Sequence, residues 1–178
     1  MSRWNIDPDH SVAAFAIRHM MVVDIRGLFN NISGTIDFDP ADIGRSYVEV
    51  NIDAASVTTN NKKRDEHLNT GDFFEVSKYP LIIFKSTVIE KTGADRAKVT
   101  GNLTLHGITR PVKLDVEYAG PVKSPAEIGG ETTMGFRTAL VLNRSDYAMD
   151  WNVPLEGDGL MLGKEVRLNL EIEADLVE

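Results

Sequence analysis

Alternating apolar and polar side chains dominate this chain, most clearly in residues 166–176. Every second residue there is apolar and those between are polar or charged; the apolar set is Val166, Leu168, Leu170, Ile172, Ala174 and Leu176. Side chains of a β-strand point to opposite faces in turn, whereas a helix would scatter these residues around its circumference. The run therefore predicts a long strand whose apolar face needs a cover.

The same two-residue period recurs along the chain. It predicts further strands over residues 11–21, 34–38, 48–52, 81–89, 99–105, 112–116 and 132–143. In the first of these, Ala13, Phe15, Ile17 and His19 share the face that we expect to point inward. Short turns are expected at 91–95 and 106–111, and longer loops at 120–130 and 150–163, where glycine and proline gather.

One stretch, residues 58–68, breaks this pattern. Its polar run follows Asn and Thr residues that can cap a helix, so it predicts a short exposed helix, with Phe73 or Phe74 tucked under the turn after it. The remaining strands follow one another through hairpins, which favours an antiparallel sheet. A sheet of about eight strands splits into a sandwich or closes into a barrel, and closure lets the last strand pair with the first. We expect an all-β, eight-stranded antiparallel barrel, as a single domain over residues 1–178.

Composition narrows the choice of partners. The 178 residues include 27 acidic and 19 basic side chains, a net charge of −8, so nucleic acids and anionic membrane surfaces are poor default partners. There is no cysteine, and no apolar segment after Met1 has the length of a signal peptide. The apolar runs are also too short for an integral membrane segment. We therefore expect a cytoplasmic protein.

Metal and nucleophile chemistry find little support in the sequence. The four histidines are His10, His19, His67 and His106, with no His-x-His or helical i,i+4 pair, and a regular strand would point the first two to opposite faces. Neither a Gly-x-Ser-x-Gly elbow nor a phosphate-binding glycine loop is present. We expect structural roles for the histidines, no metal, no cofactor and no catalysis.

Two charged groups invite alternatives. Asp146 lies two residues after Arg144, so on an extended chain the two would share a face and form an ion pair. The basic run Lys62–Arg64 is either a solvated helix face, neutralised by the acidic residues that follow it, or an anion clamp for a head group near a barrel mouth. For the two lysines we favour the solvated face.

Many large apolar side chains are left for the barrel interior. A barrel of eight strands has room for packed side chains or for one small ligand, and periodicity alone leaves both outcomes open.

The ordered motifs of the chain resemble the YceI-like family of lipocalin-like, polyisoprenoid-binding proteins. They comprise Asp7-Pro8-Asp9-His10-Ser11, Gly27-Leu28-Phe29, Gly34-Thr35-Ile36-Asp37-Phe38, Arg64, His67-Leu68, Phe73-Phe74, Tyr79-Pro80, Phe84-Lys85-Ser86, residues 101–109, Pro111-Val112, Arg144-Ser145-Asp146-Tyr147, Gly163 and Glu165-Val166. The chain departs from the family at Tyr147-Ala148, where Phe-Gly is more frequent, and the departure bears on the local backbone geometry.

The resemblance implies a barrel that encloses a long-chain isoprenoid or similar fatty amphiphile of the quinone or precursor type, for carriage, storage or sequestration. It also implies that the chain can form a homodimer. On this basis, the expected ligand-contacting residues are Phe15, Ile17, Phe29, Phe38, Phe84, Leu103, Leu105, Leu140, Leu142, Trp151, Leu168, Leu170 and Ile172. Two alternatives remain: an enzyme of calycin-like fold that uses His19, Arg144 and Asp146, and an interaction module with a solid barrel.

Overall fold

The closing strand, predicted from the most regular alternation, is β11 (Leu162–Leu176), and it pairs with β10 (Thr132–Asn143) over most of its length. The computed structural model describes residues 1–157 and 159–177. The sheet contains nine further strands: β1 (Ser2–Ile6), β2 (Val12–His19), β3 (Val23–Phe29), β4 (Ile32–Phe38), β5 (Tyr47–Asp53), β6 (Val57–Thr58), β7 (Leu81–Lys91), β8 (Arg96–Leu105) and β9 (Ile108–Lys123). Short 3₁₀ helices cover Ile43–Arg45, Ala54–Ser56, Ala126–Ile128 and Arg144–Tyr147 (η1 to η4).

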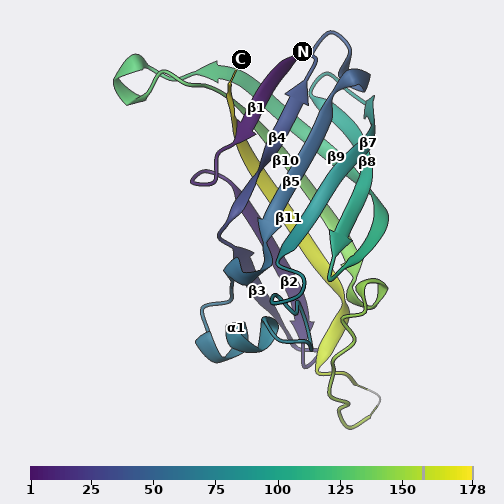
Figure 1. Ribbon diagram of the computed structural model, residues 1–178. Helices are drawn as coiled ribbons and strands as arrows, with labels where there is room; N and C mark the ends of the chain where they lie inside the picture. Colours follow the sequence, from purple (N-terminus) through teal and green to yellow (C-terminus); the bar gives the residue numbers. More distant parts are fainter. Residues whose placement is uncertain (158, 178) are drawn as a thin grey trace.

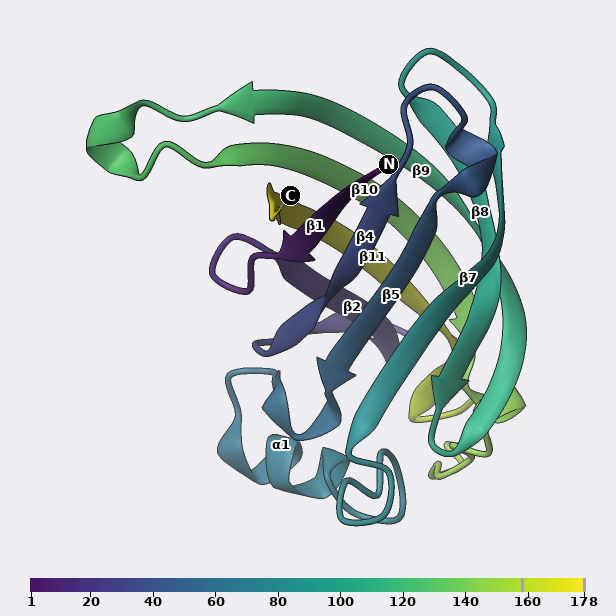
Figure 2. The same cartoon turned by 45° about the horizontal axis from the view of Figure 1, so that its top comes forward.

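These eleven segments make the eight strands of a closed antiparallel barrel, because three strands are each broken in two. β1 continues as β2, β3 as β4, and β5 as β6; β1 pairs with β4 while β2 pairs with β3. β11 pairs with both β1 and β2 and so closes the sheet (Figures 1 and 2). The prediction of an eight-stranded barrel sealed by its first and last strands is confirmed.

The break between β1 and β2 is tied to β11 by side-chain hydrogen bonds. The Asp7 carboxylate accepts a bond from the Asp9 backbone N–H at 2.8 Å, which holds the turn. The Ser11 hydroxyl donates to the Glu173 carbonyl at 3.2 Å and accepts from the Glu173 N–H at 3.1 Å. The backbone groups of Glu173 that lose a regular partner at the break are therefore satisfied by Ser11.

The predicted helix is α1 (Lys62–Leu68), shorter than the stretch from which it was expected. The Asn61 side chain caps it by accepting from the Arg64 N–H at 3.1 Å, and the Asp65 carboxylate accepts from the Thr59 hydroxyl and N–H. α1 lies at the end of the barrel opposite to the two termini (Figure 1). No described helix has the length and apolar character needed to cross a bilayer.

Two turn predictions need correction, because β9 is longer than its alternating core. It begins at Ile108, so the turn expected at 106–111 reduces to His106-Gly107, and it continues into the loop expected at 120–130. The last residues of β9 pair with β10 in a ribbon that projects from the barrel (Figure 2). Beyond Glu117, no strand in the described part of the chain pairs with the other edge of β9, so Pro121 is tolerated without an N–H. Asp158, in the loop expected at 150–163, lies outside the described residues.

Candidate functional site

The barrel encloses a cavity of about 380 Å³ with an almost entirely apolar wall. The structure places on this wall all thirteen side chains that the sequence analysis assigned to ligand contact: Phe15, Ile17, Phe29, Phe38, Phe84, Leu103, Leu105, Leu140, Leu142, Trp151, Leu168, Leu170 and Ile172. Their contact with a ligand stays a prediction. A solid barrel, the alternative that periodicity left open, does not describe this protein.

The strand register explains why these side chains meet. Leu168 of β11 lies between Leu140 of β10 and Phe15 of β2 in the pairing, so the three share one face across neighbouring strands. Phe29 lies 5.7 Å from Phe15 and 5.5 Å from Phe74, measured between ring centroids. The aromatic layer therefore extends from the sheet to the segment that follows α1.

Two glycines keep the cavity open by letting phenylalanine rings lie against the wall. A Cβ at Gly27 would stand 2.3 Å from Cζ of Phe15, and a Cβ at Gly101 would stand 2.5 Å from Cζ of Phe84. Each ring therefore occupies the space over a glycine in the adjacent strand. With any larger residue at these two positions the rings would have to move, and the barrel interior is the space available to them.

A fully enclosed guanidinium anchors the loop at the α1 end of the cavity. Arg144 is only 4% exposed; its Nε donates to the Gly163 carbonyl at 2.9 Å, and Nη1 donates to the carbonyls of Met149 and Trp151 at 2.5 and 2.9 Å. Burial lowers the pKa of Arg144, opposed by the charge of Asp150. Arg144 borders the cavity, and in the described part of the chain no carboxylate lies within ion-pair distance of it.

The aromatic side chains at this end come from three segments. The His67 ring of α1 meets Trp151 edge to face at 4.8 Å and Phe73 at 5.1 Å, and its Nε2 lies 2.7 Å from the Asp72 carboxylate. Arg64, one turn earlier on α1, also borders the cavity and bonds to the Thr59 hydroxyl and carbonyl at 2.6 and 2.9 Å. The α1 end of the mostly apolar cavity thus carries the guanidinium groups of Arg64 and Arg144 and the imidazoles of His19 and His67.

Sequence reasoning missed several wall residues. Phe73 or Phe74 was expected to tuck under the chain; Phe73 is buried and Phe74 half-buried, and both border the cavity although neither was assigned to the ligand site. Others lie on the inward face of β4, β5, β7 and β8, and the same alternation would have found them: Ile36, Val48, Val50, Ile52, Ile82 and Val99. Lys62 and Lys63, in contrast, are exposed, and Lys62 faces Glu66 at 3.9 Å, as expected for a solvated helix face.

The catalytic alternative lacks its required convergence. His19 and Arg144 border the cavity, but Asp146 is exposed and does not. The expected ion pair between Arg144 and Asp146 is wrong, because residues 144–147 form η4 and not a strand. The Asp146 backbone carbonyl instead accepts a bond from Arg110 at 2.5 Å.

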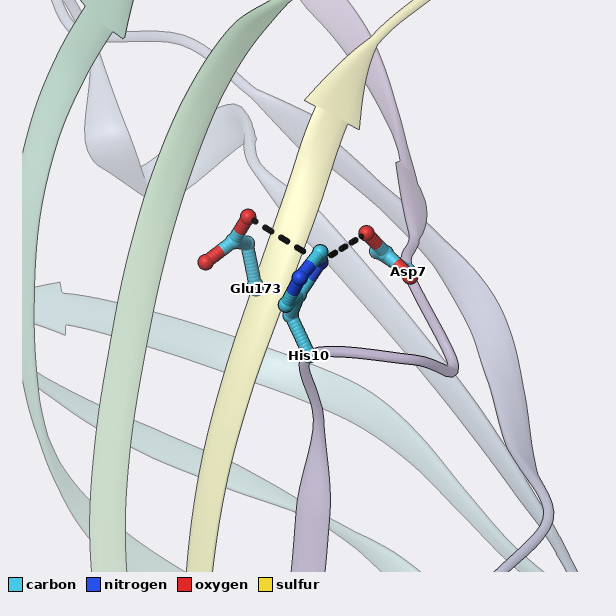
Figure 3. Close-up of side chains that lie close together, drawn as sticks. All are labelled: Asp7, His10 and Glu173. Carbon is cyan, nitrogen blue, oxygen red and sulfur yellow. Dashed lines mark hydrogen bonds and ion pairs between the residues drawn. The ribbon is translucent and has the colours of Figure 1, made fainter. Parts of the chain in front are cut away.

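The side chains of Asp7, His10 and Glu173 gather on the outer surface (Figure 3). Nδ1 of His10 lies 2.7 Å from Asp7 Oδ2 and 3.7 Å from Glu173 Oε1. His10 belongs to the β1–β2 turn, so the strand-parity argument applied to it does not hold. The Asp7 hydrogen bond raises the pKa of His10, with smaller effects from the charges of Asp7 and Glu173, and the same bond lowers the pKa of Asp7. When His10 is protonated, its ion pairs with Asp7 and Glu173 link the β1–β2 break to β11.

The other histidines also have local roles. His106, in the β8–β9 turn, lies with Nδ1 2.9 Å from the Tyr147 carbonyl, which ties that turn to η4. Its second nitrogen lies 3.6 Å from the Glu75 carboxylate. The His106 ring also meets Tyr79 edge to face, with ring centroids 5.0 Å apart, so the segment after α1 packs against this turn.

Comparison with known proteins identifies the family. Residues 4–174 match the family described as YceI-like domain. UPF0312 proteins of Staphylococcus aureus strains N315 and MSSA476 are each 32% identical over 178 residues, which covers 100% of both chains. A solved Campylobacter jejuni YceI protein is 34% identical with a TM-score of 0.74 and 90% of each chain covered.

Two more distant structures share the fold. BcnA of Burkholderia cenocepacia has a TM-score of 0.79 at 24% identity, covering 94% of this chain and 98% of its own. A polyisoprenoid binding domain of Saccharophagus degradans, implicated in plant cell wall breakdown, has a TM-score of 0.73 at 17% identity and covers 99% of both chains. By its sequence match, its curated relatives and its barrel, the chain belongs to the YceI-like family.

Proposed function

We propose that this barrel binds a long-chain isoprenoid or similar fatty amphiphile in its cavity, for carriage, storage or sequestration and without catalysis. The observation that carries the proposal is the enclosed apolar wall of the cavity. The thirteen side chains expected from the sequence to contact a ligand all lie on this wall. The volume of about 380 Å³ falls in the range of small-molecule sites, about 300–1,000 Å³. The polyisoprenoid binding domain with the same fold supports this ligand class.

The energy of such a complex comes from burying the hydrocarbon tail. Each methylene removed from water is worth about 0.8 kcal/mol, so a few isoprene units supply roughly 10 kcal/mol before ordering costs. One extra apolar carbon changes the free energy by only about 1–3 kcal/mol. We therefore expect tight binding with weak selectivity for chain length.

We assign the head group of the ligand to the α1 end of the cavity. Arg64 and Arg144 border it there, and neither faces a carboxylate within ion-pair distance in the described part of the chain. Each guanidinium already donates to protein oxygens, but Nη1 of Arg64 and Nη2 of Arg144 have no hydrogen-bond partner in the described part of the chain. A head group with accepting oxygens can bond to these nitrogens, whereas a plain hydrocarbon cannot. Quinone carbonyls meet this requirement, and for that reason we place the quinone or quinone-precursor class first.

The proposal is tested by extraction and by reloading. Denaturing mass spectrometry of freshly purified protein should release a stoichiometric apolar molecule, and the delipidated protein should take up a short-chain ubiquinone that quenches tryptophan fluorescence. Ala13→Phe fills the cavity between Phe29 and Leu170 and should lower affinity for the probe about ten-fold or more. Ala139→Phe adds the same ring to the outer face and should leave affinity unchanged.

Two results would count against the proposal. One is a native protein that yields no apolar molecule and takes up no probe. The other is equal probe affinity in the Ala13→Phe and Ala139→Phe variants, with both folded by circular dichroism, since this would place any bound molecule outside the barrel.

A further inference from the structure

The turn between β2 and β3 exposes four consecutive apolar side chains. Met20, Met21, Val22 and Val23 are 39%, 57%, 76% and 50% exposed, and we call them the apolar tip. Single exposed apolar residues are ordinary on a protein surface, but a contiguous group marks an interaction site. Here the group stands at the end of a two-stranded hairpin.

The backbone conformation of the tip does not explain why two methionines occupy the turn. Met20 and Met21 adopt left-handed conformations, with φ of 51° and 61°. Such a pair of conformations suits Asn-Gly, which is both more polar and less strained there than two methionines. Neither burial nor turn geometry therefore accounts for methionine at these positions.

The tip adjoins the wall of the cavity. The Met20 N–H donates to the Met161 carbonyl at 2.7 Å, and His19 pairs with Leu162 across the sheet. His19, Met161 and Leu162 all border the cavity. The tip thus lies at the same end as α1, opposite to the termini (Figure 1).

Cationic side chains lie beside the tip on the outer face of β2, β3 and β11. Arg18 and Arg167 both contact the Asp24 carboxylate, and Arg26, two residues along from it, is exposed. Lys164 and Glu165 lie beside the same group, so four cations face two anions and this surface has a positive balance, although the protein carries a net charge of −8. Phosphate head groups that approach this surface would therefore meet a local positive charge, in spite of the negative net charge of the protein.

We propose that the apolar tip docks on the surface of a lipid bilayer, so that cargo passes between bilayer and cavity at the α1 end. This inference rests on the proposed function, because only an apolar cargo requires such a route. Exposed apolar side chains that lie next to cationic ones favour binding to a membrane interface, because the apolar groups enter it and the cations attract anionic lipids. Methionine side chains are flexible and adapt to an irregular surface.

The test uses flotation of the full-length protein with vesicles of phosphatidylcholine, with and without phosphatidylglycerol. The double variant Met20→Asn, Met21→Gly installs the residues that the turn prefers, so it should fold at least as well as the native protein while its vesicle binding falls about ten-fold. Val22→Ser should weaken vesicle binding, whereas Val122→Ser, at a 66% exposed valine on the projecting ribbon, should not.

Cargo binding is measured separately, by tryptophan quenching with short-chain ubiquinone in the absence of vesicles. Unchanged quenching with lost flotation and slower quinone transfer from vesicles supports docking. Equal flotation of the double variant and the native protein overturns it while leaving the proposed function intact, and loss of quenching in the native protein overturns the proposed function itself. A native protein that self-associates through the tip, by light scattering, and does not float also overturns docking.

Discussion

Arg144 shows how a single side chain can organise a loop in this barrel. Its guanidinium donates to three backbone carbonyls, those of Met149, Trp151 and Gly163. Met149 and Trp151 lie at the start of the segment that joins η4 to β11, and Gly163 is the second residue of β11, so one planar group with five donors closes that segment. Trp151 is thereby held where its ring meets His67 and forms part of the cavity wall.

The backbone conformation of Ala148 is strained and lowers the free energy of unfolding, and a single substitution should relieve this strain. It follows η4 in the left-handed region, with φ of 56° and ψ of 26°. The left-handed conformation costs a residue with a Cβ roughly 1–2 kcal/mol, and glycine loses about 0.5–1 kcal/mol more backbone entropy on folding. Ala148→Gly should therefore raise the free energy of unfolding by about 0.5–1 kcal/mol in urea titration. Because Gly135 already has open space and no positive φ, Gly135→Ala is the reciprocal control and should not destabilise the protein.

Individual side-chain partners were the hardest feature to predict. The expected Arg144–Asp146 pair assumed an extended chain, and η4 turned the two side chains apart. No local pattern could have shown that Arg144 bonds to carbonyls as far away as Gly163, because that contact exists only after β10 and β11 pair. The Tyr147-Ala148 departure, in contrast, did indicate one of the described positions with unusual backbone geometry, since Ala148 has a positive φ.

At the scale of elements, alternation found one segment of each of the eight barrel strands, because both faces of a barrel strand impose it. The segments β1, β3 and β6 were not predicted. β11 puts Leu168, Leu170 and Ile172 on the cavity wall and Glu171 outside, as its period required. The breaks inside strands were not predicted, since a bend changes the direction of the chain without changing its composition. Ser11 satisfies the backbone at one such break, but its hydrogen-bond partner is Glu173, which lies far along the chain.

The ion pairs at the β1–β2 break predict a pH dependence of stability. The folded pKa of His10 is raised above its unfolded value of about 6.5, so its contribution is fully present below that pH and is lost as pH rises through the raised pKa. The folded pKa of Asp7 is lowered, so its contribution is present above an unfolded value of about 3.9 and is lost as pH falls through the lowered pKa. The stability difference between the native protein and His10→Gln should be largest between these limits, when unfolding is followed in urea at several pH values.

A titration by nuclear magnetic resonance isolates the same pair. In Asp7→Asn the imidazole of His10 should titrate at a lower pH than in the native protein, because the main cause of its raised pKa is removed. High salt should reduce the difference, since His10 is exposed. An unchanged His10 titration in Asp7→Asn would refute this account of the pair.

At the scale of the whole molecule, closure and hollowness are separate properties. Closure follows from strand number and pairing, and the sequence predicted it. Hollowness depends on details that periodicity does not record, such as Gly27 under the ring of Phe15. Near the termini the barrel is filled instead, by buried side chains that do not border the cavity: Trp4, Ile6, Met134 and Ala174. The same alternation thus produces a packed corner and an open cavity, and side-chain size at a few inward positions decides between them.

A hollow barrel should be stabilised by its own ligand, and this links one inward residue to the stability of the whole molecule. Ligand at about 100 times its Kd adds about 2.7 kcal/mol to the free energy of unfolding. Leu170→Glu places a carboxylate on the apolar wall and should abolish ligand retention and lower stability by about 2–5 kcal/mol or more. Glu171→Ala, on the opposite face of the same strand and exposed, should change neither by more than about 0.5 kcal/mol. Urea unfolding with and without short-chain ubiquinone measures both effects, and equal tolerance at the two positions would show that the inward and outward faces of β11 are wrongly assigned.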